Sequence, residues 1–249
     1  MNLRILILSD AHLFGTRNTA LFGVDTYRAL SVTVEQIKAS EKTFDLLVAL
    51  GDLSEDGSAE AYGDFDALTS SLAGSVIWVR GNHDDFSTLQ QDLLSSYCKP
   101  EWHRDPWHFI FLDTTLRGKD EGRLGPGEMD RLRKFLGKHP DGYILIFMHH
   151  QPMLVGSAFI DDLALQDRDQ FLNLVAGFRN VKGIVFGHVH QQVDLIYHGM
   201  RMLSVPATSM QFKPNSEQLD FDSLQHGYRV LTLSPDGHLR TTVEMVPPG

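Results

Sequence analysis

Short apolar runs alternate with amphipathic stretches along most of the chain. The runs are nearly continuous, rich in Ile, Leu and Val, and closed by polar residues or glycine, which is typical of strands buried on both faces. We predict strands at Leu3–Leu8, Leu46–Leu50, Val76–Val79, Phe109–Leu112, Tyr143–Met148 and Val181–Phe186. The stretches between them have helical periodicity. We predict helices at Thr26–Ala39, Ala59–Leu72, Thr88–Leu94, Glu128–Leu136 and Arg168–Ala176.

This alternation predicts a sheet covered by helices on both faces. Asp25 and Ser58 precede the first two predicted helices, where their side chains are suited to be N-caps. The last third of the chain differs, because strand-like segments there are joined by turn signals. These segments are Val193–Tyr197, Met202–Val205, Tyr228–Leu233 and Leu239–Met245. They predict a second sheet or an antiparallel extension. The sequence shows neither a repeat nor a linker, so we expect one domain over residues 1–249.

Composition narrows the classes of function. The 249 residues carry a formal net charge of −10, which disfavours binding to nucleic-acid backbone or to an anionic membrane. Cys98 is the one cysteine, which excludes an internal disulfide and agrees with a reducing compartment. The first apolar run ends at Asp10, too soon for a signal peptide or a membrane span. We therefore expect a cytoplasmic protein; its oligomeric state is not indicated.

Five polar clusters come immediately after five of the predicted strands. They are Asp10-Ala11-His12, Gly51-Asp52, Gly81-Asn82-His83-Asp84, His149-His150 and Gly187-His188-Val189-His190. Since ligand sites in open α/β sheets form at the carboxyl ends of the strands, we expect five strands of one sheet to bring the clusters to one edge. In extended backbone, Asp10 and His12 would project to the same side, as would His188 and His190.

The residue types in these clusters favour a metal site. Imidazole and carboxylate together suit Mn, Fe or Zn better than Mg or Ca. Asp52 is the expected bridge between two cations, and such a pair, about 3.5–4 Å apart, activates water and neutralises phosphate charge. A lone histidine after a strand is more often packed or exposed than a ligand. The ordered set of five clusters, each at a strand end, is what favours metal binding here.

Several other polar residues are expected to play no direct part. We interpret the histidines outside the clusters as surface or core residues: His103, His108, His139, His198, His226 and His238. Neighbouring side chains in a strand point in opposite directions, so His150 is expected to support His149 without binding metal. Asp84 is expected either to orient His83 or to cap a helix.

The ordered motifs over residues 10–190 resemble those of the calcineurin-like metallophosphoesterase superfamily. The resemblance implies an α/β fold of four layers (αββα), in which a double β-sandwich is flanked by helices. It implies a first metal bound by Asp10, His12, Asp52 and His190. It implies a second metal bound by Asp52, Asn82, His149 and His188. His83 matches the histidine that the family uses at the phosphate and the leaving group.

A narrower resemblance concerns residues outside the shared motifs. Residues 8–14 and 205–214, and Gly227-Tyr228-Arg229, are similar to bacterial class III 3',5'-cyclic nucleotide phosphodiesterases. Ala11 replaces the commoner Thr. Ala207 and Ser209 replace the commoner Ser and Cys.

The narrower resemblance implies hydrolysis of 3',5'-cyclic nucleotides, cyclic AMP in particular, to 5'-nucleotides by a hydroxide that bridges two metal ions. His83 and Asn82 would be catalytic, and Asn82, His83 and His12 would contact the substrate. The metals would be Fe, Mn or both, with Zn as an alternative. The expected partner is a small cyclic nucleotide, not a nucleic-acid polymer or a membrane.

The sequence also allows other functions and two interpretations of one loop. Another phosphodiester, such as a glycerophosphodiester, a 2',3'-cyclic nucleotide or a nucleotide-sugar lipid, would suit the same metal chemistry, as would a simple monoester. A non-catalytic scaffold of the same fold is a further alternative, although the motif set is intact. Residues 14–27 are either a flap over the site or an ordinary loop.

Overall fold

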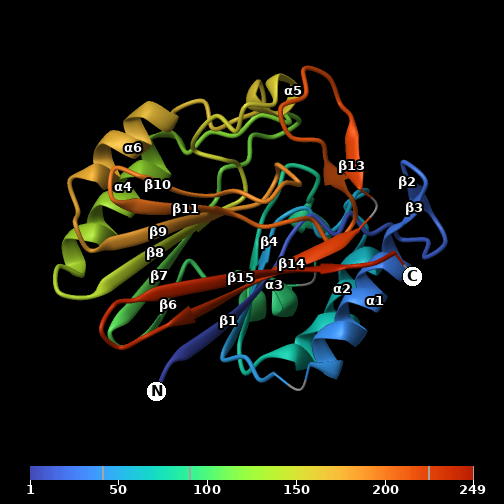
Figure 1. Ribbon diagram of the computed structural model, residues 1–249, viewed down its shortest axis with the longest axis horizontal. Coiled ribbons are helices and arrows are strands. Elements are labelled where there is room, and N and C mark those ends of the chain that lie inside the picture. The colour runs from blue at the N-terminus through green and yellow to red at the C-terminus, as the bar shows by residue number, and fades with distance from the viewer. Residues whose placement is uncertain (41, 90, 224, 249) are drawn as a thin grey trace.

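Two β-sheets packed face to face form the centre of the computed structural model, which describes residues 1–40, 42–89, 91–223 and 225–248 (Figure 1). In this part of the chain, the first sheet has five strands in the order β15 (Leu239–Val246), β14 (His226–Leu233), β1 (Leu3–Leu8), β4 (Leu46–Leu50) and β5 (Val76–Val79). The second has six, in the order β10 (Asp194–Tyr197), β11 (Met200–Ser204), β9 (Val181–Phe186), β8 (Tyr143–Met148), β7 (Trp107–Leu112) and β6 (Glu101–Arg104).

Helices cover the outer face of each sheet (Figure 1). The first sheet is covered by α1 (Thr26–Ala39), α2 (Ala59–Thr69) with the 3-10 turn Ser70–Leu72, and α3 (Gln91–Tyr97). The second is covered by α4 (Gly125–Lys138), α5 (Ala158–Asp161) and α6 (Arg168–Ala176). The result is the predicted four-layer α/β arrangement. None of the helices in the described residues is both long and apolar enough to cross a membrane.

Alternation of side chains along the central strands explains their continuous apolar runs. In β1, Ile5 and Ile7 point between the two sheets, whereas Leu6 and Leu8 pack against the helices of the first sheet. All four side chains are fully buried. A strand in the middle of four layers has no face toward water, so both sets of alternate positions must be apolar.

The structure confirms most of the predicted elements. Asp25 accepts a hydrogen bond from Arg28 N (2.9 Å), and Ser58 Oγ accepts one from Ala61 N (3.4 Å), as expected of N-caps. The helix predicted at Thr88–Leu94 has the wrong bounds. A 3-10 turn, Phe86–Thr88, capped by Asp85, comes first, and α3 begins at Gln91. Residue 90, which the predicted helix includes, lies outside the described residues.

The C-terminal strands do not form a sheet of their own. β14 and β15 extend the five-stranded sheet, with β14 antiparallel to β1, while β10 and β11 extend the other. β11 runs parallel to β9, contrary to the antiparallel expectation. Two small hairpins, β2 (Ala20–Leu21) with β3 (Val24–Asp25) and β12 (Gln211–Phe212) with β13 (Phe221–Ser223), lie at one end of the sheets (Figure 1).

Arg229 of β14 joins the two sheets from inside. Its side chain is buried, and it donates to Ser204 O (2.7 Å), Val193 O (3.0 Å) and Thr241 Oγ1 (2.9 Å). Ser204 is the last residue of β11, so its bond to Arg229 crosses from the first sheet to the second, whereas the bond to Thr241 of β15 stays within the first. Burial lowers the pKa of Arg229 to about 10, which leaves the guanidinium charged at neutral pH.

We expect Arg229→Met to lower the free energy of unfolding by about 2–3 kcal/mol, because it leaves buried acceptors without a donor. Urea denaturation followed by circular dichroism measures the change. The matched control is Arg201→Met, which removes a partly exposed ion pair with Asp194 and should cost less than about 1 kcal/mol. Equal destabilisation by both substitutions would contradict the bridging role of Arg229.

Candidate metal centre

The five polar clusters meet at the carboxyl ends of β1, β4, β5, β8 and β9. The first three of these strands belong to the five-stranded sheet and the last two to the six-stranded sheet. The expectation that one sheet delivers all five was therefore wrong. The two sheets stack with their carboxyl ends on the same side, so the clusters face one another across the space between the sheets.

The sequence interpretation expected extended backbone at the two pairs of candidate ligands, and this expectation was wrong. Asp10 and His12 have φ of 54° and 49°, and His188 and His190 have φ of 66° and 46°. Asp52 is similar, at 50°. The left-handed conformation costs a side-chain-bearing residue about 1 kcal/mol or more. Cross-loop hydrogen bonds hold it in place: Asp10 N donates to Gly51 O (3.0 Å), and His12 N to Asp52 O (2.9 Å).

Three histidines of the site share one hydrogen-bond pattern. The Nδ1–H of His12 donates to Glu55 Oε2 (2.6 Å), that of His149 to Leu50 O (2.9 Å), and that of His190 to Met210 O (2.8 Å). Each acceptor fixes a proton on Nδ1, so Nε2 of each ring is directed into the site. Histidines that bind metals are commonly oriented in this way.

The first group consists of Asp10, His12 and His190, whose ligand atoms lie within 4.8 Å of one another. His12 Nε2 is 3.2 Å from His190 Nε2, and His190 Nε2 is 3.5 Å from Asp10 Oδ1. Both Nδ1 atoms already donate to oxygen, so the facing Nε2 atoms present two lone pairs and cannot hydrogen-bond to each other as neutral rings. A cation held by this group would satisfy both nitrogen atoms and the carboxylate.

The second group adjoins the first at Asp52. His149 Nε2 lies 3.2 Å from Asp52 Oδ2 and 3.1 Å from Asn82 Oδ1. The same Asp52 oxygen is 3.8 Å from His12 Nε2, so it faces both groups. His188 Nε2 is buried without a hydrogen-bond partner among the described residues, which a bound cation would supply. The donor set therefore fits two metal ions.

Two glycines make these approaches possible. A Cβ at Gly51 would lie 2.3 Å from His149 Nδ1, and one at Gly81 would lie 2.2 Å from Asp52 Oδ1. Both distances are shorter than any normal contact, so a side chain at either position would displace a candidate ligand. The backbone at both glycines therefore approaches the site closely.

Glu55 is a site residue that the sequence interpretation missed. Its Oε2 accepts from His12 Nδ1 and lies 3.1 Å from His83 Nδ1, so one carboxylate oxygen holds two imidazoles. Burial alone would raise the pKa of Glu55, but the hydrogen bonds to the two histidines outweigh it and lower it to about 2. Burial would lower the pKa of His83, but Glu55 and Asp52 raise it to about 9. His83 is therefore protonated at neutral pH.

Asp84 and His150 support the loops of the site. Asp84 neither orients His83 nor caps a helix: its carboxylate accepts from the backbone N–H groups of Leu53, Ser54 and Gly81, and so ties the two loops together. His150 lies close to His149 and His188, but both its ring nitrogens already have partners. Nε2 donates to Asp120 O (3.0 Å), and Nδ1 accepts from Thr114 Oγ1 (2.7 Å). His150 is therefore not available to a metal.

The charges of the site suit cations. Burial would raise the pKa of Asp10 and of Asp52, but nearby histidines, His190 and His149 respectively, outweigh it and lower both. Burial lowers the pKa of His188 well below its usual range, which keeps that ring neutral. Asp52 and Asp10 outweigh the effect of burial on His149 and raise its pKa to about 9. A metal at His149 Nε2 would take the place of this proton.

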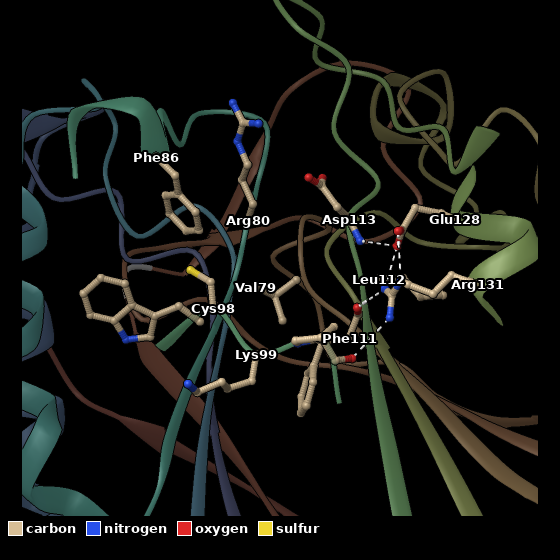
Figure 2. Close-up of a pocket in the computed structure, with 12 residues that line it drawn as sticks. Val79, Arg80, Phe86, Cys98, Lys99, Phe111, Leu112, Asp113, Glu128 and Arg131 are labelled. Carbon is tan, nitrogen blue, oxygen red and sulfur yellow. Dashed lines mark hydrogen bonds and ion pairs between the residues drawn. The ribbon is translucent and has the colours of Figure 1, made fainter. Parts of the chain in front are cut away.

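A cavity of about 250 Å³ opens onto the clusters and is bordered by His12, Asp52, Asn82 and His83. A larger cavity, about 390 Å³, lies at the carboxyl ends of β5 and β7 (Figure 2). Its described lining includes none of the candidate ligands. Arg131 there donates to Glu128 and to Phe111 O, and Glu128 also accepts from Asp113 N, so these charges join α4 to β7 (Figure 2). The smaller cavity is the candidate active site.

The chain is similar to curated phosphodiesterases along almost its whole length. It is 36% identical over 251 residues to the 3',5'-cyclic adenosine monophosphate phosphodiesterase CpdA of Vibrio vulnificus, an alignment covering 100% of this chain and 92% of that protein. It is 34% identical to the protein of that name from Escherichia coli strain K12, over 96% of this chain and 88% of the relative.

Solved structures share the fold at much lower identity. A dimetal phosphatase from Danio rerio superposes with a TM-score of 0.65 at 14% identity, covering 99% of both chains. The purple acid phosphatase PPD1 from yellow lupin gives 0.64 at 14% identity, over 98% of this chain and 53% of that one. Residues 3–192, which carry all five clusters, match the calcineurin-like phosphoesterase family. The chain therefore belongs to the calcineurin-like phosphoesterases, a family that implies a centre of two metal ions.

Proposed function

We propose that the protein hydrolyses 3',5'-cyclic nucleotides, cyclic AMP in particular, to 5'-nucleotides. The observation that carries the proposal is the convergence of three Nε2 atoms, from His12, His149 and His190, on Asp10 and Asp52. The substrate is suggested by the relatives named cyclic AMP phosphodiesterase, which are 32–36% identical over at least 96% of this chain. The single cysteine agrees with action in a reducing compartment such as the cytoplasm.

We assign the candidate ligands to two metal positions that share Asp52. The first position is held by Asp10, His12, Asp52 and His190. The second is held by Asp52, Asn82, His149 and His188. Nitrogen and oxygen ligands in this mixture favour Fe or Mn, with Zn as the alternative. When bound, such a pair neutralises phosphate charge and lowers the pKa of water.

The residues around the metals orient the substrate and supply a proton. Glu55 engages Nδ1 of His83, so the free Nε2–H is the group that faces the substrate. We propose that this Nε2–H protonates the 3' oxygen as it leaves phosphorus. Asn82 is neutral and contacts a phosphate oxygen without repelling it. His12, whose ring lies 5.0 Å from that of His83, borders the same phosphate position.

Turnover of four substrates by the metal-loaded protein tests the proposal. Cyclic AMP, cyclic GMP, 2',3'-cyclic AMP and an aryl phosphodiester are compared at equal concentration, with Mn and with Fe. We expect cyclic AMP to give the highest kcat/KM. A higher kcat/KM for another phosphodiester would contradict cyclic AMP as the substrate but would still support metal-dependent phosphodiester hydrolysis. Failure with all four under both metals would favour a non-catalytic scaffold.

We expect Glu55→Gln to lower kcat/KM for cyclic AMP by about 10- to 100-fold, as is usual when the partner of a metal-binding histidine is altered. The amide keeps the shape of the side chain but loses the charge that holds both His12 and His83. Metal content and steady-state kinetics measure the effect. Glu60→Gln, the same change at an exposed position on α2, is the control and should leave both unchanged. Full activity in the Glu55 variant would remove the positioning role.

A further inference from the structure

An apolar chamber adjoins the candidate metal centre. It is the part of the 250 Å³ cavity that is lined by the apolar side chains of Leu21, Phe22, Phe159, Leu163, Phe212 and Leu219. None of the described residues that line the cavity is Lys or Arg. A second phosphate group would find no cation in the chamber, whereas an apolar, planar group would find contacts on several sides.

The chamber is built from segments that are far apart in the sequence. The β2–β3 hairpin supplies Leu21 and Phe22, α5 supplies Phe159, and the β12–β13 hairpin supplies Phe212. The two hairpins pack on each other: the rings of Phe22 and Phe221 are 5.1 Å apart (hairpins in Figure 1). Behind them, Val24, Ala29 and Met210 form a small core of their own. The two hairpins therefore pack together where they form the walls of the chamber.

Phe212 links the chamber to the metal centre. Its ring stacks on that of His190, with centroids 4.2 Å apart and an angle of 6° between the planes. The ring of Phe159 meets Phe212 edge-on at 5.4 Å. The aromatic side chains of Phe212 and Phe159 therefore lie beside the metal centre, where they can contact a group attached to a bound phosphate.

Phe22 has an unfavourable backbone conformation for a bulky residue, and its apolar side chain is exposed. It has φ of +49° and is followed by Gly23 at +84°, so the two form the tight turn of the β2–β3 hairpin. Positive φ at both turn residues strongly favours Asn, Asp or Gly, and a bulky side chain there is strained. The Phe22 side chain is also 59% exposed. Backbone strain of this kind clusters at active sites and ligand-binding sites.

We propose that the apolar chamber binds the base of the nucleotide, with Phe22 as the outer aromatic surface and Phe212 as the inner one. This rests on the proposed function and narrows it to substrates with one phosphate and one base. Any nucleobase can stack on an aromatic side chain, because every base has a π-face.

Phe22→Asn tests the proposal, because Asn suits the turn and removes the ring. We expect KM for cyclic AMP to rise about tenfold with kcat changed less than about twofold, the loss typical of one stacking side chain. The melting temperature should stay the same or rise, since the strain is relieved. Phe22→Tyr, which keeps the ring, should retain KM within about twofold. Ile196→Asn, an exposed apolar residue on β10, is the control and should change neither.

Binding to the metal-loaded protein separates this inference from the proposed function. Calorimetry with 5'-AMP and with inorganic phosphate needs no turnover. We expect Phe22→Asn to weaken the binding of 5'-AMP about tenfold and to leave the affinity for inorganic phosphate unchanged. Unchanged 5'-AMP affinity and KM, or an equal loss for phosphate, would overturn the chamber assignment. If the native protein binds 5'-AMP through Phe22 but does not hydrolyse cyclic AMP, the proposed function fails and the chamber stands.

Discussion

Asp52→Ala is expected to abolish nearly all turnover and to reduce the metal content from two ions per chain to one. Asp52 Oδ2 is the atom that faces both His12 and His149, so no other described side chain can replace it between the two groups. Charge stabilisation by a metal ion is worth several kcal/mol, and each 1.4 kcal/mol is a factor of ten in rate. We therefore expect kcat to fall about 10³-fold or more, measured with cyclic AMP beside elemental analysis of the purified protein.

The control for this substitution is Asp130→Ala, at an exposed position on α4 where the carboxylate pairs with Arg133. It should leave kcat and metal content unchanged. Circular dichroism checks that both variants fold. A folded Asp52 variant that still holds two ions per chain would show that Asp52 does not bridge the two positions.

His83→Ala is expected to keep both metal ions but to hydrolyse cyclic AMP about 10²- to 10⁴-fold more slowly, the range typical of general acid catalysis. The leaving 3' alkoxide is a strong base and needs a proton, whereas an aryl phosphodiester releases a weaker base. The same variant should therefore lose much less activity toward the aryl substrate. Side-by-side kinetics on the two substrates measure this difference.

Equal losses on both substrates would show that His83 acts on the phosphate and not on the leaving group. Full activity on cyclic AMP would remove it from the mechanism. His238→Ala is the control, because that side chain is 79% exposed and its ion-pair partner is Asp236 at the Pro235-Asp236-Gly237 turn. Metal analysis of the His83 variant distinguishes a lost proton donor from a disturbed centre.

The sequence predicted the ends of the strands well, because each buried run stops where polar residues begin. Leu8, Leu50, Val79, Met148 and Phe186 close their strands as expected. The structure brings the clusters that follow them into contact. The roles of individual residues as metal ligands stay predictions, as does the single domain over residues 1–249.

The division of the clusters between two sheets was not predictable in the same way. β1 and β8 are both strands with four or more fully buried apolar residues, so their sequences look alike. Which strands pair is decided by contacts between distant residues, and a single apolar run does not carry that information. The same holds for the apolar chamber, whose walls come from residues 21 to 219.

The backbone of the site and the role of Glu55 were missed for different reasons. Asp and His enter the left-handed conformation more readily than most residues, so Asp10 and His12 carried a weak signal of it. Glu55 lies three residues after Asp52 and beside Asp56, in a polar loop. From the sequence, either acid was an equally good candidate for a site residue. Only the position of its carboxylate between two histidines distinguishes it.

The pairing of β1 with β14 has a consequence for synthesis on the ribosome. Leu3 is paired with Leu233, and His12 faces His190, 178 residues later. A growing chain can form neither the middle of the first sheet nor the metal centre until those later residues have emerged. Such non-local pairing slows folding and leaves apolar strands exposed while the chain grows. We therefore expect hydrolytic activity to arise late, and a chain stopped before residue 190, which lacks the proposed ligand His190, to have none.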